Sequence, residues 1–395
     1  MDYQLSHRVN AIQPSPTLAV SQKAAELKAA GKDVIGLGVG EPDFDTPEFI
    51  KTAAKKAIDD GHTKYTAVDG IKELKEAVVA KFKRDNQLTY SNDEILISAG
   101  GKHSIYNLLT AWLDSDDEVV IPAPYWVSYP DMVKLVGAKP VIVGAGIEQR
   151  YKITPQQLDA AITPATKLMF INSPSNPAGT AYTVDELKGL AEVLRKHPRV
   201  LVATDDMYEH ILWNKNDFAN LAMVAPDLRD RIVILSGVSK AYAMTGWRIG
   251  YAAGPKKIIA AMKKVQSQST SNPTSISQYA ALAALNGDQS CIDTMVSAFK
   301  QRHDYLVEAL NAIDGIQCVA GDGTFYTFAN INELMRKAKV ETDVELCEKL
   351  LNDVGVALVP GSAFGTDGHC RLSFATDLDT LKEAVARIRK FAGAL

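Results

Sequence analysis

Short apolar runs alternate with amphipathic stretches from about Glu94 to Tyr251. The runs are four to six residues long and rich in Val, Ile and Leu, which is typical of strands buried on both faces. We therefore predict six strands in this region, at Glu94–Ser98, Glu118–Ile121, Lys167–Ile171, Val200–Ala203, Arg231–Leu235 and Trp247–Ala252.

Helical patterns occupy several of the intervals between these runs. The clearest covers Thr183–Lys196, where apolar residues recur at helical spacing, Thr183 and Glu186 form a capping box, and Pro198 follows the end. Strands that alternate with helices indicate an α/β fold in which a mostly parallel sheet is covered by helices.

The C-terminal part shows a different order of elements, which favours a separate, smaller α+β domain. We divide the chain into an N-terminal segment (residues 1–45) that packs with the small domain, a large domain (46–290) and the small domain (291–395). The elements expected outside the large domain are helices at Thr17–Ala30, Cys291–Ile313, Asp343–Val354 and the last eighteen residues, and strands at Ile316–Val319, Thr324–Phe328, Val356–Val359 and Arg371–Ala375.

Composition narrows the function classes. Of 395 residues, 46% are hydrophobic and 23% charged, the balance of an ordinary globular protein. Lys and Arg total 43 against 47 Asp and Glu, so no excess of positive charge favours nucleic acid or an anionic membrane as a partner. The longest apolar run, Tyr279–Leu285, has seven residues, far fewer than the roughly 20 of a membrane-spanning helix.

The first twenty residues contain no apolar segment typical of a signal peptide, so we expect a cytoplasmic protein. The four cysteines form no CxxC pair, and the seven histidines form no HxxxH pair. We therefore expect reduced thiols and no metal site.

Two glycine motifs resemble nucleotide-binding sequences but lack essential parts. Gly36, Gly38 and Gly40 give a GxGxG spacing without the third glycine and the following helix of a dinucleotide fingerprint. Gly101 and Lys102 resemble the end of a P-loop, but His103 replaces the required Ser or Thr. We assign neither class of nucleotide site.

The loop Ser236–Gly250 is the strongest candidate for chemistry, because it joins two predicted strands that hold it in place. Lys240 in this loop, taken alone, is more typical of a surface lysine at a strand end than of a catalytic residue. Together with Arg248 and Ser239, however, it forms a plausible cradle for an aldehyde cofactor that carries a phosphate.

Three more loops follow predicted strands. Ser98–Ser104 (SAGGKHS) suits an anion at a helix N-terminus, Asn172–Gly179 (NSPSNPAG) holds Asn176 rigidly, and Asp205 and Tyr208 come just after Val200–Ala203. Each could be an ordinary turn. All four loops nevertheless follow the carboxyl ends of strands, where open α/β sheets bind ligands.

These motifs, in this order and spacing, resemble the fold-type-I pyridoxal-phosphate-dependent aminotransferases, most closely the bacterial aspartate aminotransferases of the prokaryotic subgroup. The resemblance spans essentially the whole chain and rests on PSPT, GEPDFDTP, SAGGKHS, PAPYWVSYP, NSPSNPAG, TDDMYEH, SKAYAMTGWRIGY, VPGSAFG and CRLSFA. It implies a large cofactor-binding domain with a mostly parallel seven-stranded sheet flanked by helices, a smaller α+β domain, and a homodimer with shared active sites.

The resemblance also assigns roles toward pyridoxal phosphate. Lys240 is the Schiff-base lysine and moves the proton between the substrate's Cα and the cofactor's C4′. Asp205 pairs with the pyridine nitrogen, Tyr208 and Asn176 bond the phenolic oxygen, and Trp126 stacks on the ring. The phosphate is held by Gly101, Lys102, Ser239 and Arg248, joined by Tyr65 of the other subunit.

For the substrate, the resemblance implies that Arg371 grips the α-carboxylate, with Asn176 and Trp126 beside it and Gly40 closing over it. Lys102 and Thr17 bind the second carboxylate of a dicarboxylic substrate. Lys102 is also compatible with a solvated lysine in the first turn of a helix. Two departures from the usual motifs, Ser236 and Thr324, remove no catalytic group.

The expected reaction moves the amino group of L-aspartate to 2-oxoglutarate by a ping-pong mechanism. An aromatic or prephenate aminotransferase is the alternative within the family, although Gln13 stands where some prephenate-accepting relatives carry a basic residue. Outside it, a pyridoxal-phosphate lyase or cyclising enzyme and a non-catalytic binding domain stay open. The joint presence of Lys240, Asp205 and Arg371 argues against the non-catalytic domain.

Overall fold

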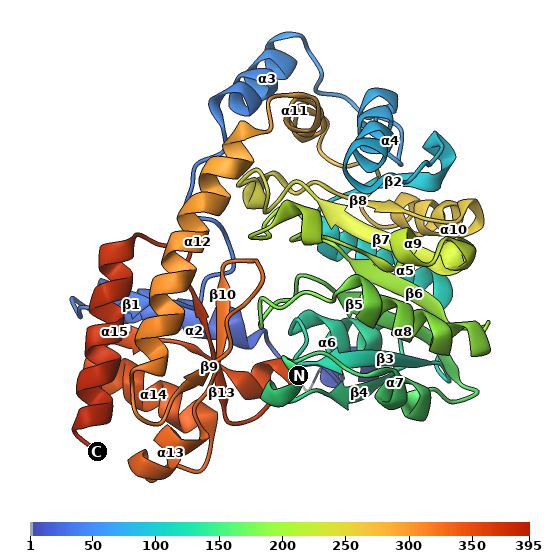
Figure 1. The fold of residues 1–395 in the computed structure, drawn as a ribbon. Coiled ribbons are helices and arrows are strands. Elements are labelled where there is room, and N and C mark those ends of the chain that lie inside the picture. Colours follow the sequence, from blue (N-terminus) through green and yellow to red (C-terminus); the bar gives the residue numbers. More distant parts are fainter. Residues whose placement is uncertain (1–2) are drawn as a thin grey trace.

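A seven-stranded sheet forms the centre of the larger part of the molecule (Figure 1). The computed structural model describes residues 3–395. The strands lie in the order β2-β8-β7-β6-β5-β3-β4, and β8 is antiparallel to both of its neighbours while the other strands run parallel. Their bounds are β2 Ile95–Ser98, β3 Glu118–Ala123, β4 Lys139–Gly144, β5 Thr166–Asn172, β6 Leu201–Asp205, β7 Ile232–Gly237 and β8 Gly250–Ala253.

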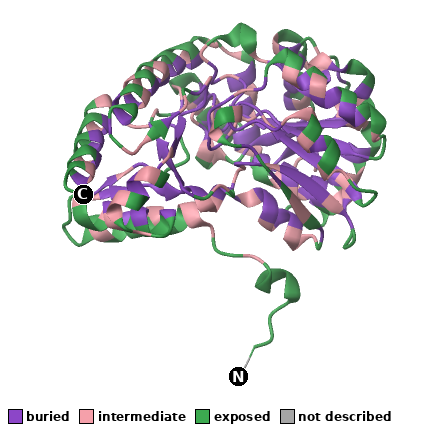
Figure 2. Cartoon of the chain, turned by 60° about the horizontal axis from the view of Figure 1, so that its bottom comes forward, coloured by how far each residue is buried: buried purple, intermediate pink, exposed green. Residues whose placement is uncertain are grey.

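Helices cover both faces of this sheet because successive strand residues point to opposite sides. Val119 and Ile121 pack in a cluster with α5, α6 and α10, whereas Val120 packs in a second cluster with α4 and α8. Figure 2 shows the strands as buried elements inside a more exposed helical layer. The helix bounds are α3 Glu48–Asp59, α4 Lys72–Asn86, α5 Gly101–Trp112, α6 Ser128–Leu135, α7 Pro155–Ala161, α8 Val184–Lys196, α9 Leu221–Val224, α10 Lys256–Ser267 and α11 Ser275–Asn286.

The predicted α/β class and mostly parallel sheet are confirmed, and two strand predictions need correction. Strand β4 was missed because it is an edge strand that contains Pro140 and is largely half-buried or exposed, so it forms no buried apolar run. The strand predicted at Trp247–Ala252 begins only at Gly250. Trp247 ends a short 3-10 helix, and Arg248 has φ +57°, which is incompatible with a strand.

The smaller part contains an antiparallel sheet in the order β12-β13-β10-β9. The strand predicted at Val356–Val359 is divided between two sheets: β11 (Val356–Ala357) pairs with β1 (Ile35–Gly36), and β12 (Val359–Pro360) pairs with β13. The other elements are α12 Ser290–Asn311, β9 Gln317–Cys318, β10 Tyr326–Asn330, α13 Asn332–Ala338, α14 Asp343–Val354, β13 His369–Ser373 and α15 Leu378–Gly393.

The N-terminal segment lies against the small part. Helix α2 (Pro16–Ala29) contributes Ala24 to a small apolar cluster with Val34 and Ala357. Residues 3–15, including α1 (His7–Asn10), project from the body of the molecule (Figure 2). The boundaries at 45/46 and 290/291 stay predictions.

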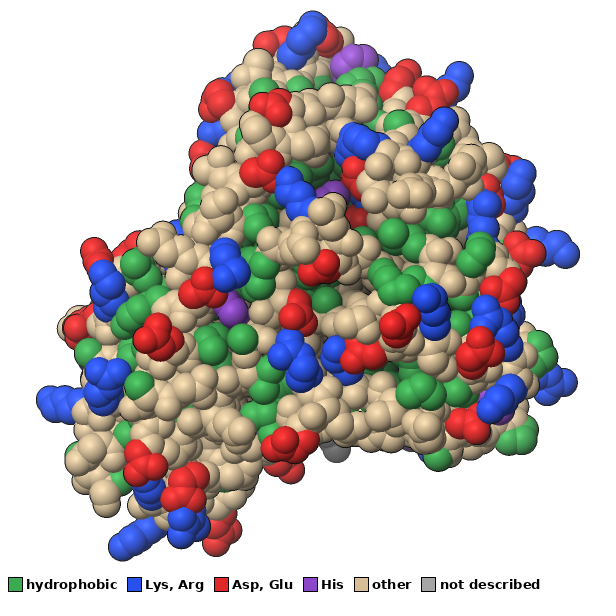
Figure 3. Space-filling view, in the orientation of Figure 1, with side chains coloured by type: hydrophobic (Ala, Val, Ile, Leu, Met, Phe, Trp, Pro, Cys, Tyr) green, Lys and Arg blue, Asp and Glu red, His purple; other side chains and the backbone are tan. Residues whose placement is uncertain are grey.

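Charged side chains of both signs are interspersed over the face seen in Figure 3, in keeping with a net charge of −4. Across residues 3–395, none of the helices combines the length and the apolar character needed to cross a membrane.

Candidate active site

A cavity of about 530 Å³ lies at the edge of the large sheet where β5, β6 and β7 end. Its walls come from the N-terminal segment, the large part and the small part. It brings together twelve of the predicted site residues, namely Thr17, Gly40, Gly101, Lys102, Trp126, Asn176, Asp205, Tyr208, Ser239, Lys240, Arg248 and Arg371.

Lys240 follows β7 and extends into this cavity. Its Nζ donates a hydrogen bond to the carbonyl oxygen of Gly40 at 2.5 Å. Burial lowers the pKa of Lys240 to about 8, although the carboxylate of Glu41 acts in the opposite direction. Near neutral pH the neutral amine, which is the nucleophilic form, is therefore more abundant than for an ordinary lysine, although the ammonium form still predominates.

Asp205 is the last residue of β6, and its carboxylate faces the cavity. Oδ2 accepts a hydrogen bond from the Tyr129 hydroxyl at 2.5 Å, and Oδ1 accepts one from the Met207 N–H at 3.2 Å. Burial raises the pKa of this carboxyl group despite both hydrogen bonds. A cationic N–H from a ligand would compensate this buried carboxylate.

Another part of the cavity lining is suited to an anion. Helix α5 begins at Gly101, directly after Gly100, whose φ is +93°. A side chain on Gly100 would collide with the guanidinium of Arg248, so glycine permits this approach. Within residues 3–395 Arg248 forms no ion pair. The helix N-terminus, Arg248 and the buried Ser239 are together suited to a phosphate.

Tyr208 and Asn176 form another wall. The Tyr208 hydroxyl lies 3.1 Å from the Tyr326 hydroxyl, within hydrogen-bond distance. Asn172 fixes the Asn176 loop to β6, since its Oδ1 accepts from the Asn176 N–H at 2.8 Å and its Nδ2 donates to the Asp205 carbonyl at 2.9 Å. Tyr208 thus contributes a hydroxyl and Asn176 an amide to the lining of the same cavity.

Arg371 enters from β13 in the small part and is only 2% exposed. It donates to Asn176 Oδ1 at 3.0 Å and to the Gly38 carbonyl at 2.7 Å, and it stacks over the Tyr326 ring at 4.4 Å. Two hydrogen bonds leave three of the five guanidinium N–H groups, and within residues 3–395 Nε has no partner. Arg371 therefore joins three regions of the chain and keeps donors for a carboxylate.

A family model described as aminotransferase class I and II matches residues 32–388. The chain belongs to this family. The family predicted from the motifs is therefore confirmed, and this aminotransferase is an enzyme of the transferase class.

Relatives of this aminotransferase cover almost its full length. The aspartate/prephenate aminotransferase of Nitrosomonas europaea is 56% identical over 98% of both proteins. The solved aspartate aminotransferase from Rhizobium meliloti has a TM-score of 0.96 at 47% identity and covers 99% of both chains. The Thermus thermophilus aspartate aminotransferase, solved with maleate, has a TM-score of 0.93 at 40% identity and covers 98% of this chain and 100% of its own.

Three contributors to the site of this aminotransferase were not identified from the sequence. Tyr129 lies within PAPYWVSYP, and Tyr326 within the segment after Thr324, but neither motif reveals that their hydroxyls meet Asp205 and Tyr208. The Gly38 carbonyl accepts from Arg371, whereas the resemblance assigns a role only to Gly40 of the GxGxG motif. Its neighbour Gly40 accepts the Lys240 hydrogen bond.

Tyr65 is the predicted site residue that lies outside the cavity. Its side chain is 92% exposed, and it precedes a segment that the buried Gln266 and Gln278 anchor through hydrogen bonds to Val68 and Thr66. Its contact with a second subunit stays a prediction.

Proposed function

We propose that this aminotransferase uses pyridoxal phosphate to transfer the amino group of L-aspartate to 2-oxoglutarate, giving oxaloacetate and L-glutamate. The observation that carries the proposal is one cavity that combines a lysine of lowered pKa, a buried carboxylate, an anion cradle and two further cations, Arg371 and Lys102. The predicted cofactor accounts for the first three of these features, and a dicarboxylic substrate accounts for the two cations.

The residues present fit this cofactor. The N–H groups at Gly101, with Ser239 and Arg248, would hold its phosphate, and the Lys102 backbone adds to this cradle. Asp205 would hold a proton on the ring nitrogen, and Trp126 would cover the ring. Tyr208 and Asn176 would bind its phenolic oxygen. When bound, the cofactor supplies an electron sink for the substrate's Cα.

Lys240 then has two tasks in the proposed reaction. Its neutral amine would hold the cofactor at the aldehyde carbon, a role that the lowered pKa provided by burial favours. Once released by the substrate, the same amine would take the proton from the substrate's Cα and would be the group that returns it to the cofactor side. The Gly40 carbonyl accepts a hydrogen bond from this amine at 2.5 Å.

The second cation, Lys102, is the basis for proposing a dicarboxylic substrate. Lys102 stands in the first turn of α5, with Nζ 4.9 Å from the centre of the Trp126 ring. Desolvation, followed by the charge of Arg248, lowers the pKa of Lys102, so a bound anion would be favourable there. Thr17 also lines the cavity and contributes a hydroxyl group. Maleate, present in the Thermus structure, is likewise a dicarboxylate.

Prephenate is retained as a second acceptor. The name of the Nitrosomonas relative favours it, since that protein is called an aspartate/prephenate aminotransferase. Gln13, which favours aspartate over prephenate in the sequence, is not among the residues that line the cavity. An aromatic amino acid remains the other alternative donor.

A panel of donors and acceptors tests the proposal. Aspartate, glutamate, phenylalanine and tyrosine would be assayed with 2-oxoglutarate, and prephenate would be assayed as acceptor with aspartate or glutamate. We expect the highest kcat/KM for the aspartate and 2-oxoglutarate pair. A clear preference for aromatic donors, or amino transfer to prephenate alone, would overturn the assignment of aspartate and 2-oxoglutarate.

Replacing Lys102 tests the dicarboxylate preference. Lys102→Ala should reduce kcat/KM for aspartate and glutamate by about 1.5–3 kcal/mol, the size of a lost charge-assisted hydrogen bond, and should affect uncharged donors little. Steady-state kinetics on both donor classes measure this difference. Equal losses for aspartate and for a neutral donor would show that Lys102 serves the cofactor or the fold instead.

The proposed homodimer makes a separate prediction about Tyr65. If Tyr65 completes the phosphate site of the other subunit, a hybrid of Lys240→Ala and Tyr65→Ala subunits contains one site with both residues intact. Mixed and refolded subunits should therefore regain about a quarter of the wild-type activity when half of the dimers are hybrids. Fully active monomers, or no recovery in confirmed hybrids, would contradict the shared site.

A further inference from the structure

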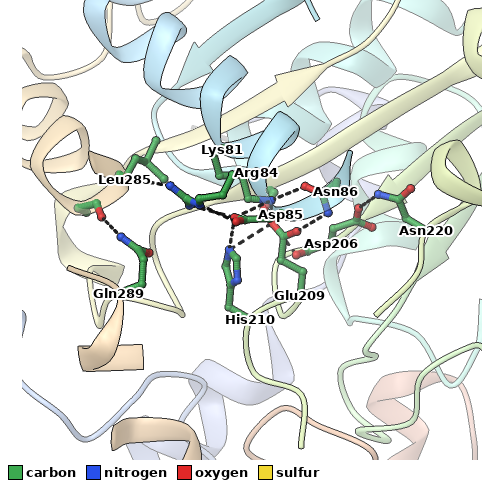
Figure 4. A network of polar contacts seen from close by, with 12 residues as sticks. Lys81, Arg84, Asp85, Asn86, Asp206, Glu209, His210, Asn220, Leu285 and Gln289 are labelled. Carbon is green, nitrogen blue, oxygen red and sulfur yellow. Dashed lines mark hydrogen bonds and ion pairs between the residues drawn. The ribbon is translucent and has the colours of Figure 1, made fainter. Parts of the chain in front are cut away.

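The segment that carries Asp205 and Tyr208 has two faces. Asp205, Met207 and Tyr208 line the cavity. Asp206 and Glu209 are instead buried in a polar network on the opposite side, only 1% and 6% exposed (Figure 4). Along this segment, residues that face the cavity are thus interspersed with residues that are buried in the protein interior.

Glu209 is the centre of this network. Its Oε1 pairs with the ammonium group of Lys81, a residue of α4 that is fully buried. Its Oε2 accepts a hydrogen bond from Asn86 Nδ2 at 3.1 Å, and Lys81 also donates to Asn86 Oδ1 at 2.8 Å. Glu209, the residue next to Tyr208, is thus tied to α4 by two residues, Lys81 and Asn86, which also bond each other.

A second set of contacts fixes Asp206 and extends the network to β7. Asp206 accepts hydrogen bonds from Thr204 at 2.6 Å and from Asn220 at 2.7 Å. The Ser236 hydroxyl lies 3.3 Å from Glu209 Oε1 and 3.4 Å from the Asp206 carbonyl. Ser236 belongs to β7, the strand that precedes Lys240. The network therefore contacts the segments that carry all three proposed catalytic residues, Asp205, Tyr208 and Lys240.

The charges around Glu209 make its position costly to change. Burial alone would raise the pKa of Glu209, but the Lys81 ammonium holds it below its ordinary value. His210 lies 3.5 Å from Asp85 and 3.8 Å from Glu209, and burial lowers the pKa of its imidazole. Movement of Glu209 would take the nearer carboxylate away from the buried Lys81 ammonium and leave it with Asp85 at 4.0 Å, which is costly for a buried cation.

We propose that Glu209 and Lys81 are positioning residues for the transamination, and that they act by holding the Tyr208 hydroxyl toward the phenolic oxygen of the cofactor. This inference rests on the proposed function. A hydroxyl held at that oxygen favours its anionic form and so lowers the pH at which the absorbance of the bound cofactor changes. A displaced hydroxyl raises that pH. Because the network does not contact Arg371 or Lys102, substrate binding should change less than turnover.

The test compares cofactor-loaded variants by their pH-dependent absorbance, kcat, KM for aspartate and thermal unfolding. The main variant is the double substitution Lys81→Met and Glu209→Gln, which leaves no unpaired charge behind. Tyr208→Phe shows the spectral shift for complete loss of the hydroxyl. Lys75→Met is the matched control: it changes the same residue type on α4, and its partner Asp69 keeps Lys263 at 3.0 Å.

For the double variant we expect the apparent pKa of the absorbance change to rise by about half a unit or more, kcat to fall about 10-fold, and KM to stay within about 3-fold of the wild type. Lys75→Met should keep the wild-type values. An unchanged absorbance pKa and kcat in the folded double variant would overturn the inference. If the double variant does not fold, Ser236→Ala decides, with the same direction of shift expected and an unchanged pKa contradicting the proposal.

The wild-type measurement separates this inference from the proposed function. A wild-type protein without any pH-dependent cofactor absorbance would refute the proposed function itself, and the inference with it. A wild-type protein with that absorbance, together with a double variant of identical pKa, would refute only the positioning role.

Discussion

Lys240→Ala is expected to abolish turnover and to remove the pH-dependent absorbance of the cofactor-loaded enzyme. Lys240 combines a place in the cavity with a pKa lowered to about 8, so it is the amine best able to react with an aldehyde. Lys102, the other lysine of the cavity wall, points from α5 toward Trp126. It is not expected to replace Lys240.

Borohydride reduction followed by peptide mass mapping identifies the lysine that is bound to the cofactor. In the wild type it should attach the cofactor covalently to residue 240, whereas in Lys240→Ala the cofactor should be released on denaturation. Since the cradle at Gly101 and Arg248 is untouched, the variant should still bind the cofactor without a covalent bond. Persistent pH-dependent absorbance in the variant, or covalent attachment at another lysine of the wild type, would contradict the assignment.

Asp205→Ala should lower the rate by several orders of magnitude while leaving the protein folded. A cofactor ring without its proton is a poor electron sink, and Asp205 is the buried carboxylate placed to hold that proton. The loss should fall on removal of the proton from the substrate's Cα. Single-turnover kinetics with ordinary and Cα-deuterated aspartate isolate that step.

Asp205→Asn is the matched variant, because it keeps the shape and an acceptor for the Tyr129 hydroxyl but removes the charge. We expect it to be nearly as impaired as Asp205→Ala, which would separate the electrostatic role from packing. Near-normal turnover in Asp205→Asn would assign the role to another group.

Local patterns were sufficient for the interior of the large sheet. Buried strands such as Lys167–Ile171 form continuous apolar runs, and loops that follow them reach one edge when the sheet is parallel. The placement of Asp205, Asn176 and Lys240 in one cavity could therefore be predicted from the sequence. The edge strand β4, with Pro140 and a partly exposed surface, gave no such pattern.

Contacts between distant segments could not be read from local patterns. The pairing of β1 with β11 divides a run that looked like one strand, and only the folded chain shows that Ile35 lies beside Val356. The environment of Lys81 is a second example of a contact that the local sequence does not reveal. In the sequence Lys81 is one lysine on an amphipathic helix, and its burial against Glu209 depends on residues 128 positions apart.

The most direct test of the proposed function runs the two half-reactions separately on cofactor-loaded protein. Aspartate added without any oxo acid should give about one oxaloacetate per active site and a changed cofactor spectrum, and 2-oxoglutarate added afterwards should give about one glutamate per site and restore the first spectrum. Continuous product formation from aspartate alone, release of CO₂ or ammonia, or a spectrum that 2-oxoglutarate does not restore would contradict the account.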